Sequence, residues 1–281
     1  MNKFGWSLVL SLVVVGGAGA AKLARPNVVY ILADDMGQGD LTCYNAESKI
    51  KTPVMDGLAK DGMRFTDFHS NSAVCTPTRY GTLTGRYAFR TRMKRGVLHT
   101  TSKSLIQKDE ATLASLLKQY GYHTACIGKW HLGFDWQFKP GVKESKGRNR
   151  VMGASIDYSK PFTLGPNQVG FDYFYGITAS LDMPPYVFLE NDHTEIVPTE
   201  IMFSSSDVAT DHGRRGYGDP NFVLEEVLPT LTQKAVDFIE QQDKKTPFFL
   251  YFPMNSPHTP IVPTAQFRGK SGAGIYGDFV L

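Results

Sequence analysis

Four short apolar runs, far apart in the chain, each lead into charged or reactive side chains, and this arrangement limits the possible folds most. The first, residues 27–33 (NVVYILA), is rich in β-branched residues and lacks polar alternation. Such a run predicts a strand buried on both faces, as in a parallel sheet. Residues 64–69, 122–127 and 247–252 are the other strand candidates.

Helical patterns separate these runs. Residues 52–62 begin with Thr-Pro and end with Gly, residues 110–120 carry leucines at helical spacing, and residues 227–241 are amphipathic. A further helix is expected to follow Cys75. Residues 135–170, rich in glycine, proline and charge, predict a long irregular insertion. The alternation predicts an α/β sandwich with a large, mostly parallel (mixed) central sheet flanked by helices.

Reactive groups in such sheets gather beyond the carboxyl ends of the strands. The four runs are followed, in order, by Asp34-Asp35, by Cys75, by Lys129 and His131, and by His258. We therefore expect these side chains to share one active site.

Asp34 and Asp35 offer two carboxylates at one strand end. Adjacent like charges repel unless a cation joins them, and hard oxygen ligands select Ca²⁺ or Mg²⁺. A helix cap or a solvated turn is the alternative interpretation.

Residues 75–79 (CTPTR) predict a reactive cysteine at the start of a helix. Proline fits the first turn, where free backbone N–H groups attract anions and favour a reactive thiol. Arg79 lies one turn after Cys75 on the same face, placed to pair with a modified cysteine or a bound anion. A buried structural cysteine and a surface arginine are the alternative.

Two histidines complete the set of candidates. Lys129 and His131 point to the same side if the strand extends that far, so that one holds a negative oxygen and the other exchanges a proton. His258 lies between two prolines, which stiffen its position as a proton donor or ligand. Surface positions and an incidental loop histidine are the alternatives.

The first 21 residues predict a secretory signal peptide. Lys3 precedes the apolar run of residues 8–15, and small residues follow at 18–20. An uncleaved anchor helix is the alternative, although the apolar run is short for a bilayer. The net charge of +3 gives no basis for a nucleic-acid partner.

Three cysteines are too few, and odd in number, for a disulfide framework in an exported chain. This anomaly directs attention to Cys75. Cys126 lies in an apolar run and is interpreted as a small buried hydrophobe.

Together these segments resemble the sulfatase family of the alkaline-phosphatase superfamily. The matching pieces occur in the family's order from Pro26 onwards, with Thr78 standing where serine is commoner. They are Pro26-Asn27-Val28 with Asp34-Asp35, Cys75-Thr76-Pro77-Thr78-Arg79 with Leu83-Thr84-Gly85-Arg86, Gly128-Lys129-Trp130-His131-Leu132-Gly133, Gly170-Phe171-Asp172 with Gly176, and Ser256-Pro257-His258-Thr259-Pro260.

The resemblance implies a nucleophile made from Cys75. A separate maturation enzyme would oxidise Cys75 to formylglycine (3-oxoalanine), which is hydrated in the resting site. One of its oxygens would attack the sulfate sulfur and release the alcohol, and deprotonation of the other hydroxyl would then expel sulfate. Ca²⁺, in preference to Mg²⁺, would be held by Asp34, Asp35 and the modified Cys75 and would polarise the sulfate.

The resemblance also implies roles for the other residues. Arg79 and His131 would hold and tune the formylglycine, and Lys129 would contact sulfate. His258 would protonate the leaving oxygen or bind sulfate. Ser180 is a weaker correspondence that implies a hydrogen bond within the site.

Family members are usually longer, and after a segment like residues 276–278 they continue to a further strand end that supplies an Asp-Asn metal pair and another lysine. Residues 22–281 are therefore expected to form the amino-terminal part of a sulfatase catalytic domain, with its carboxy-terminal part missing. We expect such a chain by itself to be unstable or weakly active.

The function expected from the resemblance is hydrolysis of a sulfated small molecule or glycan, in the periplasm or outside the cell, with no membrane span after signal cleavage. A phosphonate or phosphate diester hydrolase of the same superfamily is one alternative. An inactive anion-binding fragment, with Cys75 unmodified, is the other. A basic cluster at residues 86–95 fits a polysulfated glycan and a solvated surface equally.

Overall fold

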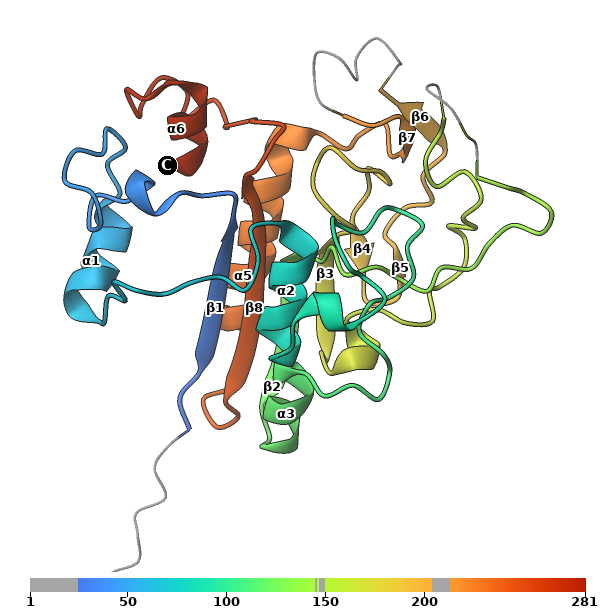
Figure 1. Ribbon diagram of the computed structural model, residues 1–281, viewed down its shortest axis with the longest axis horizontal. Coiled ribbons are helices and arrows are strands. Elements are labelled where there is room, and N and C mark those ends of the chain that lie inside the picture. The colour runs from blue at the N-terminus through green and yellow to red at the C-terminus, as the bar shows by residue number, and fades with distance from the viewer. Residues whose placement is uncertain (1–24, 145, 147–149, 204–212) are drawn as a thin grey trace, which may run out of the picture.

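A computed structural model describes residues 25–144, 146, 150–203 and 213–281 (Figure 1). The predicted signal peptide at residues 1–21 lies outside these described residues. Within them, no helix has the length and apolar character that crossing a bilayer requires.

The central sheet has six strands, and its longest strands run parallel. β1 (Val28–Asp34), β8 (Phe248–Pro257), β2 (His123–Lys129) and β3 (Tyr173–Ile177) pair in that order, and the short β4 (Leu189–Glu190) and β5 (His193–Thr194) continue the sheet antiparallel. The predicted mixed, mostly parallel sheet is confirmed. Because Asp34 pairs with Pro257 and Lys129 with Ile177, the carboxyl ends of the long strands meet at one edge.

Helices lie on both faces of this sheet (Figure 1). α2 (Cys75–Thr84) and α3 (Leu113–Gln119) cover one face, and α5 (Val227–Glu240) covers the other. α1 (Pro53–Asp61) and α6 (Gly274–Val280) lie on the side of β1. A separate small sheet pairs β6 (Glu200–Met202) with β7 (Gly216–Gly218).

Side-chain alternation along β2 divides the hydrophobic core into two clusters. Cys126 faces α2 and packs in one cluster with Leu83, whereas Ile127 faces α5 and packs in the other with Leu231. Cys126 is completely buried, and burial raises the pKa of its thiol. The interpretation of Cys126 as a small buried hydrophobe is therefore confirmed.

The strand predicted at residues 64–69 is wrong, because this segment is irregular and exposed. Phe65 and Phe68 are 59% and 75% exposed, so their apolar character does not indicate burial here. The segment is tied to residues 43–44 instead of to the sheet: the Arg64 guanidinium donates to the Cys43 carbonyl, and the Tyr44 hydroxyl donates to the Phe65 carbonyl. Because none of the described strands lies next to this segment, its backbone does not form the hydrogen bonds of a β-sheet.

β1 also differs from expectation, because one of its faces is exposed and the other is only partly buried. Val29 and Ile31 are 46% and 56% exposed. β1 lies at the edge of the sheet, and the contacts of α5 are mainly with β8, β2 and β3. The prediction from an apolar run without polar alternation therefore overestimated the burial of this edge strand.

The helix predicted over residues 110–120 begins later, at Leu113, because Thr112 caps it. The Thr112 hydroxyl accepts from the Ser115 amide at 3.0 Å, and the Ser115 hydroxyl accepts from the Thr112 amide at 2.9 Å. The insertion predicted at residues 135–170 is irregular in its described part, and Trp136 and Phe162 from it are buried in the core.

Candidate active site at the carboxyl edge of the sheet

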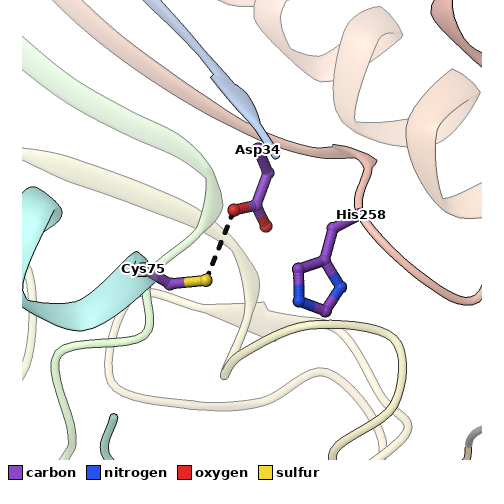
Figure 2. Close-up of side chains that lie close together, drawn as sticks. All are labelled: Asp34, Cys75 and His258. Atoms are coloured by element: carbon purple, nitrogen blue, oxygen red, sulfur yellow. Dashed lines mark hydrogen bonds between the residues drawn. The ribbon is translucent and has the colours of Figure 1, made fainter. Parts of the chain in front are cut away.

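Three reactive side chains from distant parts of the chain meet at the carboxyl edge of the sheet (Figure 2). Asp34 ends β1, Cys75 begins α2, and His258 follows β8. One ligand atom of each lies within 4.8 Å of those of the other two. A cavity of about 310 Å³ opens here, lined by Asp34, Asp35, Cys75 and Arg79 among others.

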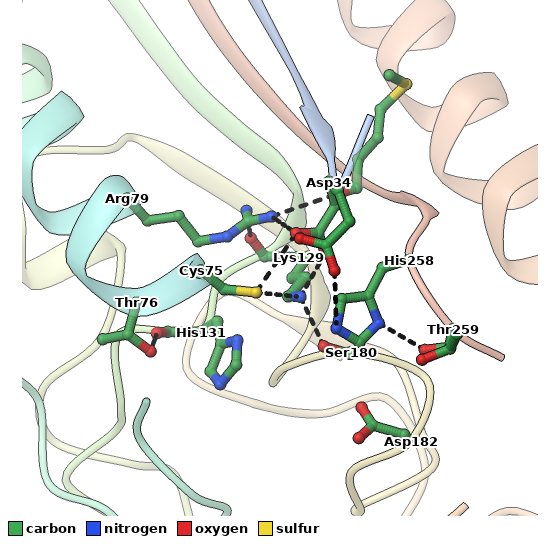
Figure 3. A network of polar contacts seen from close by, with 12 residues as sticks. Asp34, Cys75, Thr76, Arg79, Lys129, His131, Ser180, Asp182, His258 and Thr259 are labelled. Carbon is green, nitrogen blue, oxygen red and sulfur yellow. Dashed lines mark hydrogen bonds and ion pairs between the residues drawn. The ribbon is translucent and has the colours of Figure 1, made fainter. Parts of the chain in front are cut away.

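Lys129 and Arg79 bring two buried cations to the same point (Figure 3). The Lys129 ammonium pairs with the Asp34 carboxylate and donates to the Ser180 hydroxyl at 2.6 Å. Arg79 approaches the other Asp34 oxygen at 3.5 Å and donates to the Lys129 carbonyl at 2.7 Å. Burial by itself raises the pKa of Asp34, but the charges of Lys129 and Arg79 outweigh it and lower the pKa to about 2.

The Cys75 thiol lies between these charges. Its Sγ donates to Asp34 Oδ1 at 3.4 Å, and the Lys129 ammonium lies 3.4 Å from the sulfur. Burial raises the pKa of the thiol, and this effect exceeds the opposing charge of Lys129. The unmodified cysteine is therefore protonated at neutral pH, so the start of α2 does not activate it as a thiolate.

His131 reaches the site by a turn and not by strand alternation. β2 ends at Lys129, and His131 adopts a left-handed backbone with φ of 55°. Its amide donates to the Thr178 carbonyl at 2.9 Å, and its Nε2 bonds to the Leu98 carbonyl at 3.0 Å. Burial and the charges of Lys129 and Arg79 hold the pKa of the imidazole well below its usual range.

His258 faces the exposed side of the site. Its Nδ1 donates to the Thr259 carbonyl at 2.5 Å, so Nε2 is the nitrogen that is free to exchange a proton or bind a ligand. That nitrogen lies 3.6 Å from Asp35 Oδ2. Asp35 has φ of 63°, and its side chain is 58% exposed.

These residues fit a divalent cation as part of its coordination shell. Asp34 and Asp35 supply hard carboxylate oxygens, and the side chain at position 75 and a His258 nitrogen lie close enough to contribute. Ca²⁺ takes roughly six to eight oxygen ligands, more than this cluster supplies. Lys129 and Arg79 already contact Asp34, so a cation would share that carboxylate with them.

The structure adds polar residues that the sequence did not single out. Asp182 lies two residues after Ser180, is drawn with the site residues in Figure 3, and forms an ion pair with Arg214. The turn closed by the Met183 amide and the Ser180 carbonyl, 3.0 Å apart, places Asp182 there. Asp182 falls in the segment that suggested Ser180, but no sequence pattern connects it with Arg214.

Comparison with known proteins identifies relatives with this arrangement of segments. The sequence model of the family described as Sulfatase matches residues 26–274. The N-acetylgalactosamine-6-O-sulfatase of Bacteroides thetaiotaomicron is 33% identical over an alignment of 289 positions, which covers 92% of this chain and 53% of that protein. Arylsulfatase A of Bos taurus is 33% identical over an alignment of 291 positions, which covers 98% of this chain and 49% of that protein. The chain thus spans about half the length of the curated relatives it matches.

Solved structures confirm the predicted alkaline-phosphatase-like fold. One from Bacteroides thetaiotaomicron, described under the metabolism of multiple glycosaminoglycans, has a TM-score of 0.75 and 31% identity, covering 92% of this chain and 56% of that chain. The PsFucS1 sulfatase from Pseudoalteromonas sp. has a TM-score of 0.63 and 24% identity, covering 90% and 48%, and supports the fold alone.

Proposed function

Because the chain belongs to the sulfatase family, we propose that its carboxyl-edge site hydrolyses sulfate esters. The observation that carries the proposal is the meeting of Cys75 with two buried cations: the Lys129 ammonium lies 3.4 Å from the sulfur, and Arg79 lines the same cavity as Cys75. Fixed buried cations stabilise a tetrahedral oxyanion without reorganising during the reaction.

We assign the nucleophile to residue 75 after oxidation of Cys75 to formylglycine, which is typical of the family. When present, the hydrated formylglycine supplies a hydroxyl oxygen for attack on sulfur. The alternative nucleophile, the thiolate, is disfavoured because burial raises the pKa of Cys75. Lys129, 3.4 Å from the sulfur of residue 75, is placed to hold a sulfate oxygen. Arg79 donates to the backbone carbonyl of Lys129 and so helps to fix the position of that lysine.

Two histidines with different surroundings divide the proton transfers. His131 is neutral and buried, which suits it to accept a proton from a hydroxyl on residue 75. His258 Nε2 faces the more exposed Asp35, which suits it to protonate the leaving oxygen or to bind sulfate. The Ser180 hydroxyl accepts from the Lys129 ammonium at 2.6 Å and so helps to hold it next to the side chain of residue 75.

A divalent cation is typical of the family, and we propose Ca²⁺ held by Asp34, Asp35 and the modified residue 75. The carboxylates favour a hard cation. When bound, the cation supplies positive charge that polarises a sulfate oxygen. Asp34 then acts as a shared anchor, because it also pairs with Lys129 and Arg79.

We propose a sulfated sugar as the substrate class and export as the destination. Asp182 is drawn with the site residues in Figure 3, and its ion pair with Arg214 combines a hydrogen-bond acceptor with donors, the combination that sugar hydroxyls require. Export rests on the signal pattern of residues 1–21, and cell fractionation with detection of the cleaved amino terminus tests it.

Mass spectrometry and turnover together test the proposed function. Co-expression with a formylglycine-generating maturation enzyme is expected to convert Cys75 to formylglycine, and the purified chain should then hydrolyse an aryl sulfate faster than an aryl phosphonate ester. Cys75→Ala is the control and should be folded but inactive. Preference for the phosphonate would favour the diester-hydrolase alternative. A folded chain with unmodified Cys75 and no turnover would favour the anion-binding fragment.

A further inference from the structure

Thr76, the residue after the proposed nucleophile, is completely buried and makes two hydrogen bonds that join separate segments. Its hydroxyl donates to the His131 carbonyl at 2.9 Å. The same oxygen accepts from the Leu98 amide at 3.1 Å. The hydroxyl of Thr76 thereby links the start of α2 to the turn that carries His131 and to the segment at Leu98.

A third hydrogen bond closes this arrangement into a ring. The Leu98 carbonyl lies 3.0 Å from His131 Nε2. Thr76, Leu98 and His131 therefore contact one another in a closed triangle. These hydrogen bonds fix both the backbone oxygen and the side chain of His131, so the imidazole ring has little freedom to turn.

The triangle also determines which imidazole nitrogen carries the proton. A carbonyl oxygen only accepts, so the Nε2 that faces Leu98 must be the N–H nitrogen. A second proton on Nδ1 would charge a ring that is 3% exposed, and no acceptor among the described residues would hold that proton, so Nδ1 is left unprotonated. Among the described residues, Nδ1 is buried and has no hydrogen-bond partner.

The free nitrogen belongs to the site drawn in Figure 3, where the backbone carbonyl of His131 is bonded to Thr76, the residue after Cys75. An unpaired buried acceptor is costly unless a donor is supplied. The Cys75 thiol does not supply it, because its Sγ donates to Asp34 instead. This nitrogen is placed to accept a hydrogen bond from a hydroxyl on a modified residue 75.

We propose that Thr76 is a positioning residue that holds His131 as the Nε2–H tautomer, with Nδ1 presented as the proton acceptor for residue 75. The catalytic meaning of this tautomer rests on the proposed function. The positioning itself concerns only Thr76, Leu98 and His131 in the chain as it stands. The Thr76 hydroxyl acts both as a donor and as an acceptor. A residue without a hydroxyl therefore loses both hydrogen bonds, whereas serine retains them.

Nuclear magnetic resonance of the chain labelled with ¹⁵N-histidine tests the positioning without requiring turnover. His131→Gln identifies the His131 signals by their loss. We expect wild type and Thr76→Ser to show one neutral tautomer, with Nε2 protonated and Nδ1 unprotonated. Thr76→Val is expected to give a mixture of tautomers, and Thr76→Ala serves in its place if the valine variant does not fold.

Thr112→Val is the matched control. Thr112 is also buried and donates to a backbone carbonyl, that of Val169 at 2.6 Å, but belongs to the cap of α3. Its loss is expected to lower the melting temperature while the His131 tautomer stays unchanged. A wild-type Nδ1–H tautomer, or an unchanged tautomer in both Thr76→Val and Thr76→Ala, would overturn the proposal.

Kinetics separate this proposal from the proposed function. With formylglycine content measured for each variant, Thr76→Val is expected to lower kcat per formylglycine on the order of 10²-fold, with KM within about twofold. Thr76→Ser should restore kcat to within a few fold. Absence of wild-type turnover would contradict the proposed function and leave the tautomer result standing. A wild-type kcat in a Thr76→Val variant with mixed tautomers would overturn the catalytic meaning of the positioning.

Discussion

Lys129 and Asp34 form an ion pair whose side chains are 0% and 5% exposed. The two partners are not equivalent. Asp34 is also approached by Arg79 at 3.5 Å, whereas the other partners of the Lys129 ammonium, Ser180 and Cys75, are neutral. Removing the charge of Asp34 therefore leaves buried cations without a counter-charge, whereas removing the charge of Lys129 leaves Asp34 paired with Arg79.

Asp34→Asn is expected to destabilise the chain more than Lys129→Met. Asp34→Asn leaves the buried Lys129 and Arg79 cations without their shared counter-charge, which costs about 3–5 kcal/mol, whereas Lys129→Met leaves Asp34 paired with Arg79. Urea unfolding with a chelator present measures both free energies of unfolding. The double variant should recover part of the loss, and equal losses in the two single variants would refute the asymmetry.

Ser180→Ala is expected to cost about 1.5–3 kcal/mol, the range for a hydrogen bond to a charged group. The hydroxyl of Ser180 accepts from the buried Lys129 ammonium at 2.6 Å, and alanine leaves that donor unsatisfied. Ser159→Ala, at an exposed serine, is the control and should stay near the wild-type value. A Ser180→Ala variant as stable as the control would show that this bond contributes nothing to the fold.

The meeting of the main site residues was predictable because a simple geometric rule governs it. Asp34 and Lys129 end strands and His258 follows one, in a sheet whose parallel strands share one carboxyl edge. Cys75 was expected at this edge by the same rule, after a strand at residues 64–69, and a proline in the first turn predicted the helix that begins there. The strand expected before Cys75 does not exist, so its placement at this edge depends on α2 and not on a strand end.

Irregular backbone explains what the sequence did not predict. His131 reaches the site through a left-handed turn, and Leu98 through a loop, so no periodic pattern links either of them to Thr76. The same applies to Asp182 and Arg214, which pair between two loops. Such contacts depend on tertiary packing, which neither spacing nor propensity encodes.

Arg214→Ala is expected to affect a sulfated sugar and an aryl sulfate differently. If the Asp182–Arg214 pair contacts the hydroxyls of the leaving group, the variant should raise KM for the sulfated sugar roughly tenfold, the effect of one lost polar contact. KM for the aryl sulfate should stay near wild type. Arg268→Ala is the control, because Arg268 pairs with Glu225 outside the Asp182–Arg214 pair. Equal changes for both substrates would argue against a sugar-binding role.

His131→Gln is expected to make folding stability less sensitive to acid. Because the pKa of His131 in the folded chain is well below its unfolded value, the unfolded chain takes up a proton first as the pH falls below about 6.5. Stability contributed by neutral His131 is thus present above that pH and is lost as the pH falls toward the folded pKa. Melting temperatures of both proteins from pH 7.5 to 5 should converge at low pH, and parallel curves would contradict this linkage.

Gly128→Ala tests whether the close approach of β2 and β8 is what aligns the site. Gly128 precedes Lys129, has φ of 137°, and a Cβ there would lie 2.2 Å from the Pro253 carbonyl oxygen, so the strands would have to separate. We expect a loss of several kcal/mol in urea unfolding, about 3 or more, as for other severe steric changes. Gly57→Ala is the control, because Gly57 lies inside α1 with open space around it and alanine should stabilise that helix by about 0.5–1 kcal/mol. A tolerated Gly128→Ala would mean that Lys129 is positioned by its ion pair and not by the contact between the strands.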